Sequence, residues 1–276
     1  IMSTFLTKNL KAGDNIDVMP PTGNFYISSQ SDKKHYVAIC AGSGITPILS
    51  MIRHITENNP NSFFTLIYGN RTRSSTMFAQ ELLQLEKDFQ TQVYVHHVFS
   101  RENLKDFIFG RIDENLLSQL FESNNNLISA DSYFLCGPGQ MIDATQSFLL
   151  KSGVNEKNIC FERFTPVSKE VNDNEFIIDS TELISNVLIS VDGDDFEFEL
   201  SSQGKTILDA AMDLGADVPF SCKGGVCCVC KAKVMEGKAS MDANYSLSED
   251  EVEQGYILTC QSHPASEDLV VDFDEM

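Results

Sequence analysis

Four cysteines within one short stretch constrain this chain more than any other feature of its sequence. The stretch "SCKGGVCCVCKAKV" covers residues 221–234, and its cysteines are Cys222, Cys227, Cys228 and Cys230. A further cysteine, Cys260, follows later in the chain. Without Cys228, the spacing is C-x4-C-x2-C followed by a distant cysteine, which is typical of the plant-type thiolate set of a 2Fe–2S cluster. The sequence therefore predicts Cys222, Cys227, Cys230 and Cys260 as metal ligands.

Two other metal centres compete with this interpretation. Structural zinc sites usually combine two closely spaced ligand pairs, and only Cys260 with His263 resembles a second pair. A Rieske centre needs two histidine ligands, and His96 and His97 are adjacent on a predicted strand, so they face opposite ways. Cys228 breaks the ligand spacing, and we interpret it as a small buried side chain. Zinc stays open as the weaker alternative.

The cysteines and the overall composition place limits on the class of protein. With 276 residues the chain is long enough for two or three domains, and its hydrophobic content of 42% supplies several cores. No apolar run approaches the ~20 residues that span a bilayer, and no signal segment opens the chain. We therefore expect a cytoplasmic protein, and in a reducing compartment clustered cysteines are more often metal-binding than disulfide-bonded.

Acidic residues are concentrated near the C-terminus. The net charge is −20, which argues against a nucleic-acid partner. Residues 185–276 contain 19 acidic and five basic residues, whereas residues 1–164 contain 16 and 14. This acidic region either keeps the domain soluble or forms a docking face for a basic partner protein.

The hydrophobic pattern divides the chain into regions. Residues 31–164 alternate apolar strands with amphipathic helices, which predicts a parallel α/β sheet. Residues 165–184 are polar and lack a period, as in a linker. Residues 185–276 contain a hairpin, a capped helix and later strands, which predicts a small α+β unit. Residues 1–30 read as the last strands of a preceding fold, so we expect the chain to be a fragment.

Glycine loops follow two of the predicted parallel strands. "GSGITP" covers residues 42–47 and "CGPGQM" covers residues 136–141, each between a strand and a helix. Such loops let phosphate approach the backbone and a helix N-terminus, although the first loop lacks the third glycine of the dinucleotide fingerprint. The intervening "YGNRTRSS" offers Arg71 and Arg73 and no acid, which favours the 2′-phosphate of NADPH over NADH.

These motifs together resemble the ferredoxin–NADP reductase superfamily with a C-terminal plant-type ferredoxin. The resemblance rests on "GSGITP", "YGNR", "CGPGQM", "FERF" and "CKGGVCCVC" with a distant cysteine. "GGVCCVC" and "DANYSLSEDEVEQGYILTCQSHP" are most similar to reductases of phenylacetyl-CoA ring epoxidases. The resemblance implies an α/β nucleotide-binding domain with a parallel sheet of the ferredoxin-reductase type and an α+β β-grasp 2Fe–2S ferredoxin domain. It also implies electron transfer from NAD(P)H through FAD and the 2Fe–2S cluster to an oxygenase.

The resemblance also implies roles for individual residues. Residues 1–30 would be the end of a flavin-binding β-barrel, so the chain alone is expected to bind FAD weakly. Cys136 would lie by the nicotinamide as the catalytic residue. The expected cofactor-binding residues are Ser3 and Thr4 for FAD, Gly42, Ser43, Gly44, Thr46, Arg71, Arg73, Ser74, Gly137 and Pro138 for the nucleotide, and Phe164 beside the flavin. A reductase of another aromatic oxygenase or demethylase, and a non-catalytic ferredoxin-type carrier, stay open as alternatives.

Overall fold

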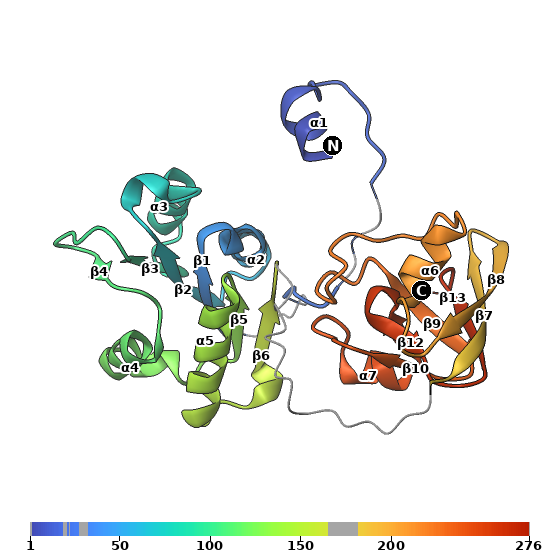
Figure 1. The fold of residues 1–276 in the computed structure, drawn as a ribbon. Coiled ribbons are helices and arrows are strands. Elements are labelled where there is room, and N and C mark those ends of the chain that lie inside the picture. The colour runs from blue at the N-terminus through green and yellow to red at the C-terminus, as the bar shows by residue number, and fades with distance from the viewer. Residues whose placement is uncertain (1, 19–20, 22, 28–32, 165–181, 276) are drawn as a thin grey trace.

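The computed structural model describes residues 2–18, 21, 23–27, 33–164 and 182–275. Its two main sheets form separate units, and Figure 1 shows them side by side with α1 (Met2–Lys8) standing apart from both. Nearly all of the predicted linker, residues 165–184, lies outside the described residues. None of the helices in these described ranges is long and apolar enough to cross a membrane.

The first unit is a six-stranded sheet in which every pairing is parallel. Its spatial order is β4 (Ile108–Phe109), β3 (Val93–Phe99), β2 (Phe63–Asn70), β1 (His35–Ala41), β5 (Ser132–Cys136) and β6 (Ile159–Glu162). The central strands are apolar because helices cover both of their faces. This confirms the predicted parallel α/β unit.

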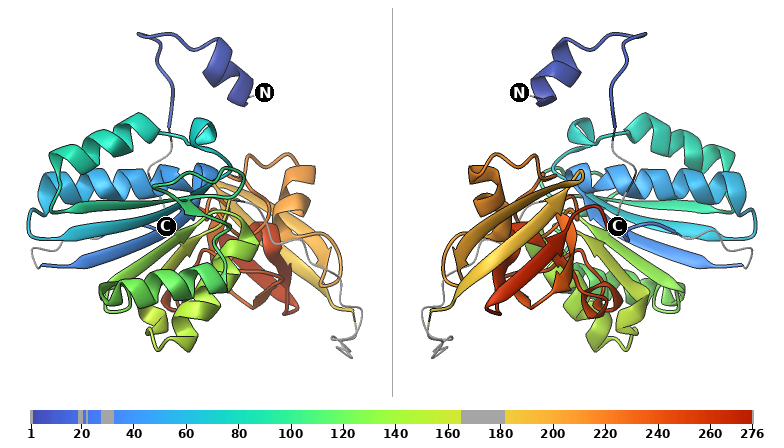
Figure 2. Two further views of the ribbon diagram at one scale, coloured as in Figure 1. Left: turned by 90° about the vertical axis from the view of Figure 1, so that its left-hand side faces the viewer. Right: turned by 90° about the vertical axis from the view of Figure 1, so that its right-hand side faces the viewer.

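Two pairs of helices cover the sheet, as Figure 2 shows. One face carries α2 (Ile45–Asn58) and α3 (Ala79–Asp88), and the other carries α4 (Glu114–Ser123) and α5 (Gly139–Lys151). Alternate residues of β1 therefore enter different cores: Ala38 and Cys40 pack with α2, whereas Val37 and Ile39 pack with α4 and α5. Short 3-10 segments connect these elements and comprise η1 (Gly42–Gly44), η2 (Arg73–Ser75), η3 (Asn125–Leu127) and η4 (Glu156–Asn158).

The second unit is a mixed five-stranded sheet with one helix packed on it. The strand order is β11 (Tyr256–Leu258), β9 (Lys231–Glu236), β13 (Asp268–Asp272), β7 (Ile184–Val191) and β8 (Asp194–Ser201). β7 and β8 form the predicted hairpin, and β13 returns parallel to β7. The remaining elements are α6 (Ile207–Asp213), α7 (Glu249–Glu253), η5 (Thr259–Gln261) and the paired strands β10 (Ala239–Met241) and β12 (Ser262–Pro264).

The N-terminal region differs from the expectation of barrel strands. Residues Met2–Lys8 form a helix, and the described part of residues 9–27 contains no strand. A strand needs a neighbour for its backbone N–H and C=O groups, and no such neighbour is present for this segment in the described structure. The prediction of strands is therefore wrong for the described residues of this region, and the barrel remnant is not confirmed. Phe25 packs edge-on against Phe134 with ring centroids 5.6 Å apart.

Candidate functional site

A large cleft of the parallel sheet lies where its strands end. Its volume is about 820 Å³, which is within the usual range for a bound cofactor. The lining comes from the carboxyl ends of β1, β2, β3, β5 and β6, from the loop before α4 and from the first turns of α5. It comprises Ala41, Gly42, Ser43, Gly69, Asn70, Arg71, Ser75, Ser100, Gly110, Arg111, Ile112, Asp113, Gly137, Pro138, Gln140, Met141, Ala144 and Phe164. Ligands of open parallel sheets bind at this edge.

Close backbone packing explains one glycine beside this cleft. A Cβ atom on Gly44 would lie 2.1 Å from the carbonyl oxygen of Cys136, closer than real atoms approach. The first loop can therefore run directly over the end of β5 only with glycine at this position. The hydroxyl of Thr46 donates to the carbonyl of Ser43 at 3.0 Å and so stabilises the turn rather than lining the cleft.

Arg71 and Arg73, the two arginines predicted to bind the 2′-phosphate of NADPH, line different clefts. Arg71 lines the large cleft together with Arg111, a residue outside the sequence motifs. The guanidinium of Arg73 instead lies 5.8 Å from the ring centroid of Phe107, in a neighbouring cleft of about 300 Å³ that His97 also lines. Ser74 is turned toward Thr72, with their hydroxyl oxygens 3.1 Å apart. The structure thus separates Arg71 from Arg73 and Ser74.

Cys136 lies in the core and not in the lining of the cleft. It is fully buried with Cys40 as its register partner on β1, and burial raises the pKa of its thiol to about 12. The thiol therefore stays protonated at neutral pH, and its side chain is turned away from the cleft, which does not support the predicted catalytic role. Phe164 does line the cleft and is 45% exposed. Thr4 lies in α1, and the side chain of Ser3 is outside the described residues.

The four predicted ligand cysteines form two pairs. Cys222 and Cys227 each influence the pKa of the other thiol. Cys260 lies beside Cys230, because the N–H and the hydroxyl of the preceding Thr259 donate to the Cys230 carbonyl at 3.1 and 2.9 Å. Among the described residues no group of three or more His, Cys, Asp or Glu side chains is placed to hold a single metal ion. A 2Fe–2S cluster is held by two cysteines on each of its two irons. The arrangement fits the cluster.

Backbone N–H groups in the loop are directed toward sulfur. The N–H of Gly224 donates to Sγ of Cys222 at 3.3 Å. Burial raises the pKa of the Cys222 thiol, but the N–H groups of Gly224 and Val226 outweigh this and lower it overall. The interaction with Cys230 likewise lowers the pKa of the Cys260 thiol. These contacts favour the thiolate form of Cys222 and Cys260, and thiolate is the form that binds iron. Burial raises the pKa of the Cys227 thiol, and the interaction with Cys260 raises that of Cys230.

The extra cysteine and a tight glycine turn shape the rest of the loop. Cys228 is buried in the domain core, with a backbone φ of 54°, and its thiol interacts with Ser246. Gly225 has a φ of 73°, and a Cβ atom there would lie 2.9 Å from the carbonyl oxygen of Ala243. Its own carbonyl accepts hydrogen bonds from the N–H of Tyr245 at 3.0 Å and from Ser246 at 3.2 Å. The loop is thus fixed to the segment before α7.

Comparison with known proteins assigns both units. Residues 38–147 match the oxidoreductase NAD-binding domain, and residues 189–265 match the 2Fe-2S iron-sulfur cluster binding domain. The chain is 40% identical over 274 residues to one subunit of the 1,2-phenylacetyl-CoA epoxidase of Escherichia coli (strain K12), covering 99% of this chain and 76% of that protein. The chain belongs to the ferredoxin–NADP reductase superfamily. Members with this domain pair are oxidoreductases that carry electrons from nicotinamide nucleotide through FAD to a 2Fe–2S cluster.

Two further comparisons agree with this membership. The chain is 28% identical to the 3-ketosteroid-9-alpha-monooxygenase ferredoxin reductase component of Rhodococcus rhodochrous, covering 98% of this chain and 74% of that protein. It also resembles an intact type IV self-sufficient cytochrome P450 monooxygenase, with a TM-score of 0.66 and 21% identity, covering 98% of this chain and 31% of the other. The structural likeness shows the fold alone.

Proposed function

We propose that this protein is the reductase component that supplies electrons to an oxygenase acting on phenylacetyl-CoA. The observation that carries the proposal is the 40% identity, over nearly the whole chain, to a component of such an epoxidase, against 28% for the ketosteroid reductase component. The electron donor is a nicotinamide nucleotide, and NADPH is proposed over NADH because Arg71 and Arg111 both line the cleft.

Within the cleft, backbone and side chains have separate tasks. Gly42, Ser43, Gly137 and Pro138 present backbone at two strand ends, where the pyrophosphate is proposed to lie against the first turn of α2. Arg71 supplies positive charge for the 2′-phosphate. The exposed ring of Phe164 offers an apolar face at the end of the cleft that is nearest β6.

Cys222, Cys227, Cys230 and Cys260 are proposed to hold the 2Fe–2S cluster as two pairs. Nicotinamide nucleotide gives up electrons two at a time and the cluster accepts one, a difference that a bound flavin reconciles. Residues 1–30 are proposed to be the end of the FAD-binding domain, with Ser3 and Thr4 near the flavin pyrophosphate. The free thiols of this chain suit the reducing environment of the cytoplasm.

An acidic edge is proposed to meet the oxygenase. β8 is the edge strand of its sheet, and Asp194, Asp195, Glu197 and Glu199 on it are exposed. Unpaired negative charge along an edge strand prevents self-association and attracts a positively charged surface. The proposed partner therefore presents a basic docking surface, and its binding should weaken as ionic strength rises.

The experiment that tests this function combines metal analysis with reconstitution. The purified chain should contain about two irons with broad visible charge-transfer bands, and zinc without iron would contradict the cluster. With FAD and NADPH added, it should support epoxidation by the oxygenase components of a phenylacetyl-CoA epoxidase but not hydroxylation by a ketosteroid oxygenase. The reverse preference would refute the proposed client. Reduction of the cluster by dithionite but never by NADPH would indicate a non-catalytic carrier instead.

A further inference from the structure

A buried arginine lies at the boundary between the two units. Arg163 directly follows β6, the edge strand on the side of the sheet that faces the second unit in Figure 1, and is only 8% exposed. Burying a charged side chain is costly unless partners replace the lost water. The contacts of Arg163 therefore indicate what keeps it in place.

On one side, Arg163 contacts the start of α5. Its Nη2 atom forms an ion pair with Asp143, whose side chain is 60% exposed. A Cβ atom on Gly139 would lie 3.0 Å from Nη1, so the guanidinium packs against the first residue of this helix. Gly137 and Pro138, which line the nucleotide cleft, come immediately before that residue. Arg163 thus supports the nucleotide loop from behind.

On the other side, Arg163 contacts the cluster-binding unit. Its Cζ atom lies 5.6 Å from the ring centroid of Tyr245 and 5.4 Å from that of Phe161, both within the range of cation–π attraction. Tyr245 is the residue whose N–H donates to Gly225 in the cysteine loop at 3.0 Å. A single side chain therefore connects the nucleotide loop with the loop that carries the cluster ligands.

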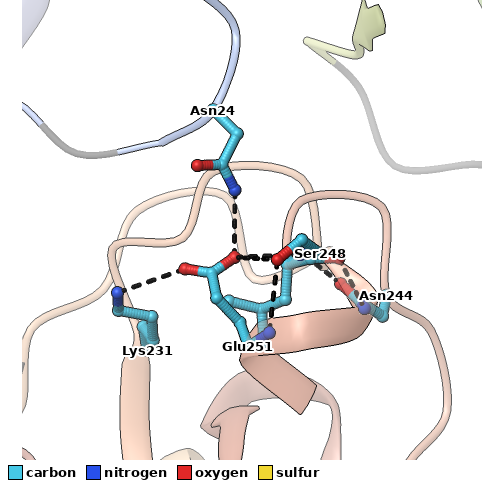
Figure 3. Close-up of polar contacts among 6 residues, drawn as sticks. Asn24, Lys231, Asn244, Ser248 and Glu251 are labelled. Atoms are coloured by element: carbon cyan, nitrogen blue, oxygen red, sulfur yellow. Dashed lines mark hydrogen bonds and ion pairs between the residues drawn. The ribbon is translucent and has the colours of Figure 1, made fainter. Parts of the chain in front are cut away.

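A second contact reaches the same segment. The side-chain amide of Asn24 donates to Glu251 at 2.9 Å, as Figure 3 shows. Glu251 also caps α7 through Ser248 and lies 3.4 Å from the ammonium of Lys231. Residues 245–251 are thus contacted at one end by Arg163, which follows β6, and at the other end by Asn24. This is expected if the segment fixes how the two units meet.

We propose that Arg163 is an interdomain positioning residue that orients the cluster loop toward the nucleotide site by stacking on Tyr245. The contact with Tyr245 is the one that would hold the two units together. Nε and Nη1 of Arg163 have no hydrogen-bond partner among the described residues, and the side chain of Asp143 is largely in solvent. The ion pair with Asp143 and the two aromatic rings together compensate the buried charge, and of these contacts only Tyr245 belongs to the second unit. Opening the interface would return the guanidinium to water.

The proposal is tested by hydrogen exchange in a double-mutant cycle of the full chain. Arg163→Leu and Tyr245→Leu should each speed exchange of amides in residues 139–145 and 243–248 by about 2- to 30-fold, the range expected for one cation–π contact. The double variant should exchange no faster than either single variant. Tyr245→Phe, which keeps the ring, should behave like the unaltered chain.

A second measurement is the rate at which NADPH reduces the cluster. This measurement rests on the proposed function, whereas the hydrogen-exchange measurement does not. With FAD supplied, Tyr245→Leu should slow cluster reduction by NADPH while leaving reduction by dithionite unchanged, because dithionite needs no interdomain contact. Lys233→Leu is the matched control, since it removes a cation 5.8 Å from Tyr256 within one unit. The proposal would be overturned if the exchange effects of Arg163→Leu and Tyr245→Leu added up in the double variant, or if Tyr245→Phe behaved like Tyr245→Leu. If Arg163→Leu fails to fold, the two Tyr245 variants still decide the question.

Discussion

Replacing Arg71 by alanine should weaken binding of NADPH and leave that of NADH nearly unchanged. Arg71 lines the large cleft, and its backbone carbonyl accepts a hydrogen bond from the N–H of Arg101 at 2.9 Å, so its position is defined. A hydrogen bond to a charged group contributes about 1.5–3 kcal/mol, and solvent reduces this at an open site. With Arg111 sharing the cleft, a loss of about 1–2 kcal/mol is expected, or roughly 5- to 30-fold in the dissociation constant.

The assay is calorimetric titration of the chain with each nucleotide at low salt. Arg73→Ala is the matched control, because the same side chain two residues later lies over Phe107 in a different cleft. It should change both affinities by less than about twofold, within the range of ordinary surface substitutions. An equal loss of NADPH and NADH affinity in Arg71→Ala would refute the 2′-phosphate assignment. An effect of Arg73→Ala equal to that of Arg71→Ala would refute the structural distinction between them.

Three further predictions concern packing, protonation and the cluster. Gly44→Ala should lower stability by about 1–3 kcal/mol, because the backbone must move away from the Cys136 carbonyl, and thermal denaturation followed by circular dichroism would show it. Burial lowers the pKa of His35 in the folded chain, so at acidic pH the unfolded chain binds one more proton than the folded chain. The free energy of unfolding should therefore fall as the pH drops below about 6.5, and melting curves of His35→Gln should depend less on pH. Cys227→Ala should abolish iron binding while Cys228→Ala retains it, measured as iron per chain; equal loss would place Cys228 among the ligands.

The sequence predicted the elements well because their signals are local. Continuous apolar runs such as residues 36–42 indicated strands covered on both faces, and the structure has β1 buried as expected. Helical spacing did the same for α2 and α5. Residues 2–8 show where such reasoning fails: the prediction of strands required pairing partners that a local pattern does not reveal, and the segment forms a helix.

The direction of individual side chains needed the tertiary structure. Arg71 and Arg73 are equivalent in the sequence, but a 3-10 turn over Arg73–Ser75 places them in different clefts. Cys136 follows the strand pattern and ends a β-strand beside a glycine loop, but strand alternation directs its side chain into the core. Arg111 gave no signal, because it belongs to a loop with no motif.

The sequence by itself determined that the cysteine loop suits a 2Fe–2S cluster, because three of the predicted ligands lie in one short loop with C-x4-C-x2-C spacing. It also determined that the nucleotide loops lie at strand ends. Only the tertiary structure decided that Cys260 lies beside Cys230, where Thr259 donates to the Cys230 carbonyl, and that Arg163 reaches Tyr245. Such contacts join residues far apart in the chain, and their geometry follows from how two packed units meet, which no periodicity records.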